Sequence, residues 1–329
     1  MKRRLLILGI AAIFILALLP TAVLAYDSGG ETYNAHDYNA MVNFLNQPSA
    51  VKGQTNAQRL GYDISQPETW TDVVWSDDTE KRLVQIGSES GASAWTSKRL
   101  AGSMDLSNCT ALEKINCDSN SMTALDVSGC TALQDLNCMD NQLTALDISG
   151  CTVLVNLICN FNMLTTLDIS ANTALEDLAC YGNQLALLDV STNKELKILV
   201  CSYNRLTALD VSANTALQNL SCSQNQLALL DVSTNTALKY LDCRENQLTT
   251  LDVSQCTALI DMDCGGNQLT ALNLSECTAL QKLKCDESVA VTGFTPLWVY
   301  FEYGLGLLVL GAVTAWILIR RRRKKRANH

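Results

Sequence analysis

The side chains most able to do chemistry in this 329-residue sequence are its fourteen cysteines. Nine of them follow one another at intervals of 21 residues, at Cys117, Cys138, Cys159, Cys180, Cys201, Cys222, Cys243, Cys264 and Cys285. Five more share a second position of the same interval, at Cys109, Cys130, Cys151, Cys256 and Cys277. Thiols can form disulfides, bind metal ions or act as nucleophiles. Which of these applies depends on the elements that position them.

A second regular series consists of carboxylates. One aspartate recurs every 21 residues, at Asp105, Asp126, Asp147, Asp168, Asp189, Asp210, Asp231 and Asp252, and Asn273 takes the ninth place. Carboxylates that lie side by side repel one another unless hydrogen bonds or cations compensate. We expect each aspartate to accept hydrogen bonds from the turn that follows it. The alternative is a weak Ca²⁺-binding stripe along Asp126, Asp147, Asp168, Asp189, Asp210, Asp231 and Asp252.

Other catalytic chemistry has little material in this sequence. The only histidines are His36 and His329, which leaves almost nothing for His-based catalysis or a zinc site. No nucleophile–base pair, phosphate-binding loop or metal-ligand cluster is recognisable. The sequence therefore predicts a protein that is not an enzyme and that needs no cofactor.

The elements that carry both series are nine copies of a 21-residue repeat, which occupy residues 101–289 without an insertion. The motif L-x-x-L-x-C-x-x-N-x-L is present, for example, at Leu133, Leu136, Cys138, Asn141 and Leu143. It resembles the leucine-rich repeat family, and within that family the cell-surface proteins of bacteria and archaea. The resemblance implies a mostly β solenoid, a right-handed arc roughly 40 Å long at ~4.8 Å per coil. It also implies that ligands bind outward residues of the concave strands.

The repeat predicts a role for each of its fixed positions. Leucines point inward and are buried only when coils stack. One asparagine per coil, from Asn120 to Asn267, should bond backbone groups that a tight bend leaves unpaired; a glycan or metal ladder is the alternative. The cysteines should form buried columns along a parallel sheet. Because their side chains point the same way, disulfide geometry is poor and free thiols are favoured.

Residues 26–100 do not repeat, and they are expected to cap the solenoid. A short helix is predicted over residues 37–45, and a hairpin over residues 70–86 around Ser76. This order resembles the α+β N-terminal cap of many leucine-rich repeat proteins. A solenoid end exposes an apolar cross-section that needs a cover. The alternative is an independent ligand-binding domain.

The two ends of the chain carry targeting signals. Residues 1–25 have a basic start, an apolar run and small residues before Tyr26, typical of a signal peptide. After a short linker, residues 290–296, the apolar run 297–319 is long enough to cross a membrane, and the basic tail 320–329 marks the cytoplasmic side. We expect a single-pass protein of the plasma membrane with an extracellular N-terminal part. An amphipathic buried helix and sortase-like processing are alternatives, although no L-P-x-T-G precedes Leu297.

The charge distribution limits the class of partner. The whole chain carries −9, but three positive charges lie in residues 1–25 and seven in residues 320–326, so residues 26–319 carry −19. Nucleic acids and anionic lipids need a basic surface. The extracellular part should therefore bind neither.

The copies differ most in the half-repeat that contains the regular cysteine, at positions on both sides of that cysteine. We predict that a ligand binds an aromatic and apolar patch on the concave face, at Ile158, Phe161, Tyr181, Val200, Tyr203 and Tyr240. Drift at unconstrained surface positions is the alternative. The predicted function is a membrane-anchored binding or adhesion module for a protein or glycan, and the second hypothesis is a structural coat protein. N-glycosylation is predicted at Asn108, Asn219 and Asn273, with Asn108 the best candidate.

Overall fold

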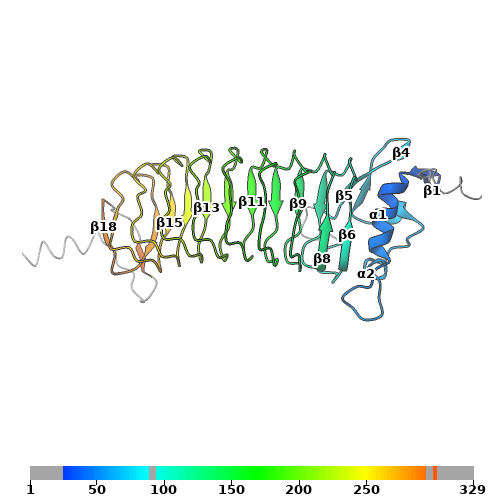
Figure 1. Cartoon of the computed structure of the whole chain (residues 1–329), viewed down its shortest axis with the longest axis horizontal. Helices are drawn as coiled ribbons and strands as arrows, with labels where there is room; N and C mark the ends of the chain where they lie inside the picture. Colours follow the sequence, from blue (N-terminus) through cyan, green and yellow to red (C-terminus); the bar gives the residue numbers. More distant parts are fainter. Residues whose placement is uncertain (1–24, 89–93, 294–298, 302–329) are drawn as a thin grey trace, which may run out of the picture.

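The computed structural model describes residues 25–88, 94–293 and 299–301. The nine repeats stack as consecutive coils of one solenoid (Figure 1), without a break between them. Each coil contributes one short strand to a twelve-stranded sheet, in which every strand after the first pairs in parallel with the next. The strands of the coils are β7 (Lys114–Asn116), β9 (Asp135–Asn137), β10 (Asn156–Ile158), β11 (Asp177–Ala179), β12 (Ile198–Val200), β13 (Asn219–Ser221), β14 (Tyr240–Asp242), β15 (Asp261–Asp263) and β17 (Lys282–Cys285). The solenoid predicted from the repeat is confirmed.

The register of the sheet equals the sequence period. Asn156 pairs with Asp177, and Leu157 pairs with Leu178, 21 residues further on. In most of these strands the central residue is buried and its two neighbours face outward. A sheet with one buried face follows from this alternation.

The other half of each coil carries the Leu-Asp-Val segment and runs extended. At the two ends of the solenoid it forms pairs of parallel strands, β6 (Ala101–Asp105) with β8 (Ser121–Asp126) and β16 (Ala271–Asn273) with β18 (Ala290–Thr292). The two apolar residues that flank each aspartate, such as Leu188 and Val190, are buried, whereas the aspartates are exposed. The core is therefore one continuous column between the two halves.

The asparagine of each bend works as predicted. Asn141 donates from Nδ2 to the carbonyl oxygens of Cys117 and Cys138, at 3.1 and 3.2 Å. Its Oδ1 accepts from the backbone N–H of Met122, at 3.0 Å. Because the same contacts recur from coil to coil, this column joins each coil to the one before it.

The residues before the first coil close the N-terminal end of the core. The predicted helix is present as α1 (Ala35–Leu45), and Figure 1 shows it standing across the end of the solenoid beside β6. The predicted hairpin is present as β3 (Val73–Trp75) and β5 (Leu83–Ile86), and β5 pairs in parallel with β7. The remaining elements are β1 (Tyr26–Ser28), β2 (Glu31–Tyr33), α2 (Asn56–Leu60), η1 (Pro67–Thr69) and β4 (Glu80–Lys81). The sheet of the coils thus continues into this segment.

The predicted membrane helix meets the structure only at three residues. Val299–Phe301 form a strand, β19, that pairs in parallel with β17. The prediction of helix is wrong for these three residues, because the outer edge of β17 offers free backbone groups that a further strand can pair. The rest of residues 297–319, the tail 320–329 and the predicted signal peptide up to residue 24 lie outside the described residues. Within the described segments, we find no helix with the length and apolar character that crossing a membrane requires.

Candidate interaction surface

Three aromatic side chains form a continuous row on consecutive coils, which we call the aromatic strip: Phe161, Tyr181 and Tyr203. The ring centroids of Phe161 and Tyr181 lie 4.9 Å apart at an interplanar angle of 69°, and those of Tyr181 and Tyr203 lie 4.8 Å apart at 46°. The three residues occupy the turns that follow β10, β11 and β12. Phe161 is 51% exposed and Tyr203 is 42% exposed. The row therefore presents a large apolar surface to solvent.

The backbone under Phe161 and Tyr203 is unfavourable for an aromatic residue. The residue before each bend asparagine has a left-handed conformation, with φ between 51° and 67°, at Ser119, Asp140, Phe161, Gly182, Tyr203, Gln224, Glu245 and Gly266. This conformation costs a residue with a Cβ about 1–2 kcal/mol, and glycine avoids the cost. Two coils do carry glycine there. Ser119, Asp140, Gln224 and Glu245 adopt this conformation as well, so it belongs to the bend, and Phe161 and Tyr203 differ from these residues in presenting exposed aromatic rings.

Gly182 makes room for its neighbour. A Cβ at this position would lie 2.9 Å from Cδ1 of Phe161, closer than real contacts allow. The ring of Phe161 therefore depends on a glycine in the next coil. Burial raises the pKa of the Tyr181 phenol, and its contact with Tyr203 raises this pKa further.

The structure separates the remaining residues of the predicted patch. Ile158 and Val200 are the last residues of β10 and β12 and lie on the sheet face. Tyr240 is the first residue of β14 and 46% exposed, at the other end of the strands from the turns that carry the aromatic strip. No ring contact joins Tyr240 to the strip among the described residues. The prediction thus combined one contiguous row with three positions elsewhere on the sheet.

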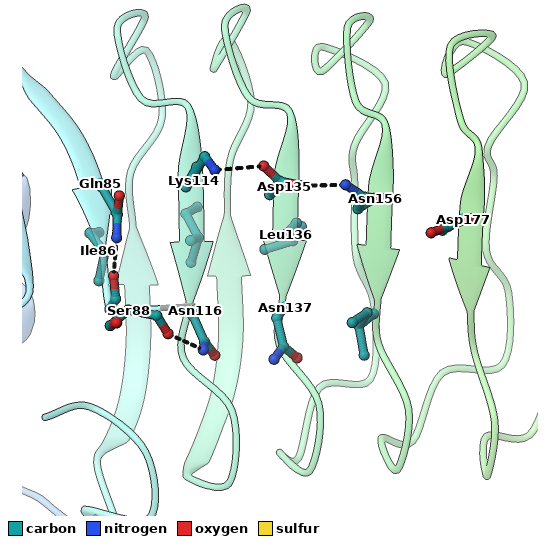
Figure 2. A pocket seen from close by; sticks show the side chains of 13 residues that line it. Gln85, Ile86, Ser88, Lys114, Asn116, Asp135, Leu136, Asn137, Asn156 and Asp177 are labelled. Atoms are coloured by element: carbon teal, nitrogen blue, oxygen red, sulfur yellow. Dashed lines mark hydrogen bonds and ion pairs between the residues drawn. The ribbon is translucent and has the colours of Figure 1, made fainter. Parts of the chain in front are cut away.

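The sheet face also carries a hollow near the N-terminal end, which sequence reasoning missed. Its volume is about 320 Å³, and it spans β5 to β11. Figure 2 shows Gln85, Lys114, Asp135, Asn137, Asn156 and Asp177 around it. Lys114 Nζ lies 3.4 Å from Asp135 Oδ2, and Asn156 Nδ2 donates to Asp135 Oδ1. A single polar residue in each coil is typical of any exposed surface. The only sequence signal for this hollow was therefore the run of amide and carboxylate side chains in neighbouring copies.

A second hollow of about 320 Å³ lies on the same face over β12 to β17. Its charged groups are largely paired with one another. Asp263 Oδ2 lies 3.3 Å from Lys284 Nζ and 3.7 Å from Arg244 Nη1, and Asp261 Oδ2 lies 2.8 Å from Lys282 Nζ. These ion pairs connect neighbouring coils and thus stabilise the stacking of the coils.

The aspartate series behaves as the structural interpretation predicts. Asp189 Oδ1 accepts from the backbone N–H of Ser191 at 2.9 Å, and the same bond recurs in the other coils. These hydrogen bonds lower the pKa of Asp168, Asp189 and Asp210. Each carboxylate therefore stabilises the turn that follows it. Ca²⁺ binding by the outer oxygens stays the alternative prediction.

A different group of possible metal ligands lies where α1 meets the first coil. Among the described residues, three such atoms come within 4.8 Å of one another only at His36, Asp37 and Cys109. Asp37 is fully buried and accepts from Arg82 Nε at 2.8 Å and from the backbone N–H of Leu83 at 2.9 Å. Because the Arg82 guanidinium already neutralises this carboxylate, the group fastens α1 to β5 and does not fit a cation.

The cysteines are buried free thiols, as predicted. All fourteen are free and buried. Burial raises the pKa of the Cys138 thiol to about 12 and that of Cys151 to about 11. Thiolate is the reactive form, so these side chains act as small apolar residues of the core.

The three predicted glycosylation sites differ in access. Asn108 is exposed at a turn of the first coil. Asn219 lies in strand β13, and Asn273 Oδ1 accepts two hydrogen bonds from Ser275. The ranking of Asn108 first therefore remains our prediction.

Comparison with known proteins finds solved structures with a similar fold. The sequence matches no protein-family profile and no curated protein. Among solved structures, the functional domain of InlJ from Listeria monocytogenes, which includes a cysteine ladder, is 38% identical with a TM-score of 0.55. The match covers 58% of this chain and 46% of that one, so the chain spans about half the length of that relative. The internalin inlF from Listeria monocytogenes has 18% identity and a TM-score of 0.51, with 60% and 69% of the two chains covered. YopM from Yersinia enterocolitica has 24% identity and a TM-score of 0.50, with 60% and 42% covered.

Proposed function

The chain is a leucine-rich repeat protein, and on that premise we propose that it is a non-enzymatic binding module of the cell surface. Its partner is a protein or glycan that docks on the aromatic strip. Large aromatic side chains supply much contact area at a small cost in side-chain entropy. The strip is also free of charge, which suits the centre of an interface.

One observation carries the proposal. The rings of Phe161, Tyr181 and Tyr203 contact one another on three consecutive coils, yet the side chains of Phe161 and Tyr203 stay half exposed. A cluster of exposed aromatic rings of this kind is typical of an interaction surface. Gly182, which opens the space for the Phe161 ring, belongs to the same arrangement.

The location is part of the proposal. A signal peptide at residues 1–25, a membrane segment at 297–319 and a basic tail at 320–329 would place the solenoid outside the cell. Proteolysis of intact cells tests this topology, because an extracellular solenoid is digested while a tag on the C-terminal tail is protected. Digestion of both only after cell lysis would contradict it.

The test of the binding site uses variants that the fold itself suggests. Phe161→Gly with Tyr203→Gly places glycine where Gly182 and Gly266 already stand. The fold should change in stability by no more than about 1 kcal/mol, because relief of the left-handed residue offsets the entropy of glycine. The matched control, Gln224→Gly with Glu245→Gly, makes the same backbone change in the same row.

The assay is binding of the purified chain to arrays of surface proteins and glycans. We expect the aromatic variant to weaken binding of the partner so found by at least about 1–2 kcal/mol, and the control to leave it unchanged. Equal binding by all three forms would refute the site. A chain that binds nothing on either array while covering the cell densely would favour the structural coat protein.

A further inference from the structure

The hollow in Figure 2 contains polar groups that the fold does not use. Within the described residues, Asn137 Nδ2, Asn156 Oδ1 and the carboxylate of Asp177 have no hydrogen-bond or ion-pair partner. Their neighbours are paired, since Lys114 faces Asp135 and Lys197 Nζ lies 2.6 Å from Glu176. Asp177 is partly buried, and this burial raises its pKa. The hollow thus holds one donor and several acceptors that no described protein group satisfies.

The placement of these groups is regular. Asn156 and Asp177 pair across β10 and β11, so their side chains stand ~4.8 Å apart along the solenoid axis. Asn137 stands at the far end of β9, next to Ile158 of β10, with which it pairs. Two rows of outward side chains, ~6.6 Å apart along the strands, therefore form the walls. Ile158 adds an apolar surface to one of them.

We infer that this hollow binds an uncharged oligosaccharide through Asn137, Asn156 and Asp177. A hydroxyl group both donates and accepts, so a run of hydroxyls satisfies a mixed set of amide and carboxylate groups. Ile158 can face the C–H surface of a sugar ring. The volume, about 320 Å³, lies within the range of ligand-binding hollows.

Other ligand classes fit less well. An anionic ligand would meet Asp135 and Asp177 in a segment whose net charge is strongly negative. A peptide could place apolar side chains against Ile86, Ile115 and Ile158, which also line the hollow, and the peptide library in the experiment tests this ligand class. The inference rests on the proposed function only in taking the chain as a binding module, and it uses side chains outside the aromatic strip.

The experiment measures binding of the full-length chain to cellohexaose, maltohexaose, mannohexaose and N-acetylchitohexaose by isothermal titration calorimetry. Hexagalacturonic acid, which is anionic, and a library of unstructured peptides serve as contrasting probes. The test variant is Asn137→Ile with Asp177→Ile. Each change copies the side chain that the next coil carries in the same row, Ile158 and Ile198, so the fold should tolerate it.

We expect one of the neutral oligosaccharides to bind, and the double variant to weaken it at least about tenfold, because hydroxyl groups of the bound ligand then lose the partners that Asn137 and Asp177 supply. The matched control, Asn219→Ile, lies in the row of Asn156 but outside this hollow, and should leave affinity unchanged. Binding of none of the four sugars, or stronger binding of the anionic sugar or of peptides that depends on Asn137 and Asp177, would overturn the inference. Loss of partner binding in the Phe161 and Tyr203 variant would then still support the aromatic strip, so the two proposals fail separately.

Discussion

The second cysteine position offers a sharp test of how the core is held together. In the central coils it is occupied by asparagine, at Asn172, Asn193, Asn214 and Asn235. Asn193 Nδ2 donates to the carbonyl oxygens of Ile169 at 3.0 Å and of Asn172 at 2.8 Å. Its Oδ1 is buried and has no partner. In the outer coils Cys256 Sγ donates to the corresponding carbonyl, that of Val232, at 3.6 Å.

The geometry predicts an order of stability for three variants of Asn193. Asn193→Cys loses one hydrogen bond of about 1 kcal/mol and removes a buried oxygen that costs about 1–3 kcal/mol, so it should stay within about 1 kcal/mol of the parent. Asn193→Ala removes the same oxygen, but it loses both bonds and leaves a small cavity, and should cost about 2 kcal/mol. Asn193→Asp places a buried negative charge against two carbonyl oxygens and should cost more than about 3 kcal/mol.

Urea unfolding of the full chain, followed by far-ultraviolet circular dichroism at pH 7 in reducing buffer, measures this order. The comparison requires the same dependence on urea in each variant, so that midpoints report stability. If Asn193→Cys were as damaging as Asn193→Asp, the equivalence of thiol and amide at this position would be refuted. Equal stability of all four proteins would show that the two hydrogen bonds of Asn193 contribute nothing.

Three further predictions follow from the site. Because burial raises the pKa of thiols such as Cys138 to about 12, iodoacetamide at pH 8 should label no cysteine of the folded chain and all fourteen after unfolding, and mass spectrometry showing several native disulfides would contradict this. The pKa of Asp189 is lowered by hydrogen bonds, so its stabilising effect is complete above about pH 4 and is lost as the pH falls further; thermal unfolding should move to lower temperature only below that pH. A rise of the unfolding temperature with Ca²⁺ that disappears in Asp189→Asn with Asp210→Asn would instead favour the cation-binding stripe. Glycopeptide analysis of native material should find Asn108 modified first, and an unmodified Asn108 beside a modified Asn219 would reverse the ranking.

The periodic part of the fold could be predicted because each position repeats the same physical requirement. Leu157 and Leu178 hold the same position in neighbouring copies and are both buried. Asn141 donates to the same backbone groups as its equivalents in the other copies. The left-handed conformation of the residue before each bend asparagine was not predicted, although Gly182 and Gly266 at this position indicate a positive φ. Helix α2 was missed too, yet Thr55 and Gln58 form a capping box at its start.

The non-periodic features could not be derived in the same way. Whether Asp177 is paired depends on which side chains the neighbouring coils place beside it, and a single repeat contains no information about this. Tyr240 was predicted to belong to one aromatic and apolar patch with Phe161, Tyr181 and Tyr203. Its position at the start of β14 puts it at the opposite end of the strands. Residue type alone therefore predicts less than residue type combined with position in the coil.

The side chains that the fold does not need are concentrated in one part of the sheet. Phe161 and Tyr203 expose aromatic rings, and among the described residues Asn137 Nδ2 and the Asp177 carboxylate have no partner, all between β9 and the turn after β12. Towards the C-terminus the sheet face is occupied instead by ion pairs between coils, such as Lys284 with Asp263. On the predicted topology the membrane lies beyond that C-terminal end. The later coils would then serve as a stiff spacer of roughly 20 Å, at ~4.8 Å per coil, which holds the binding surface away from the membrane.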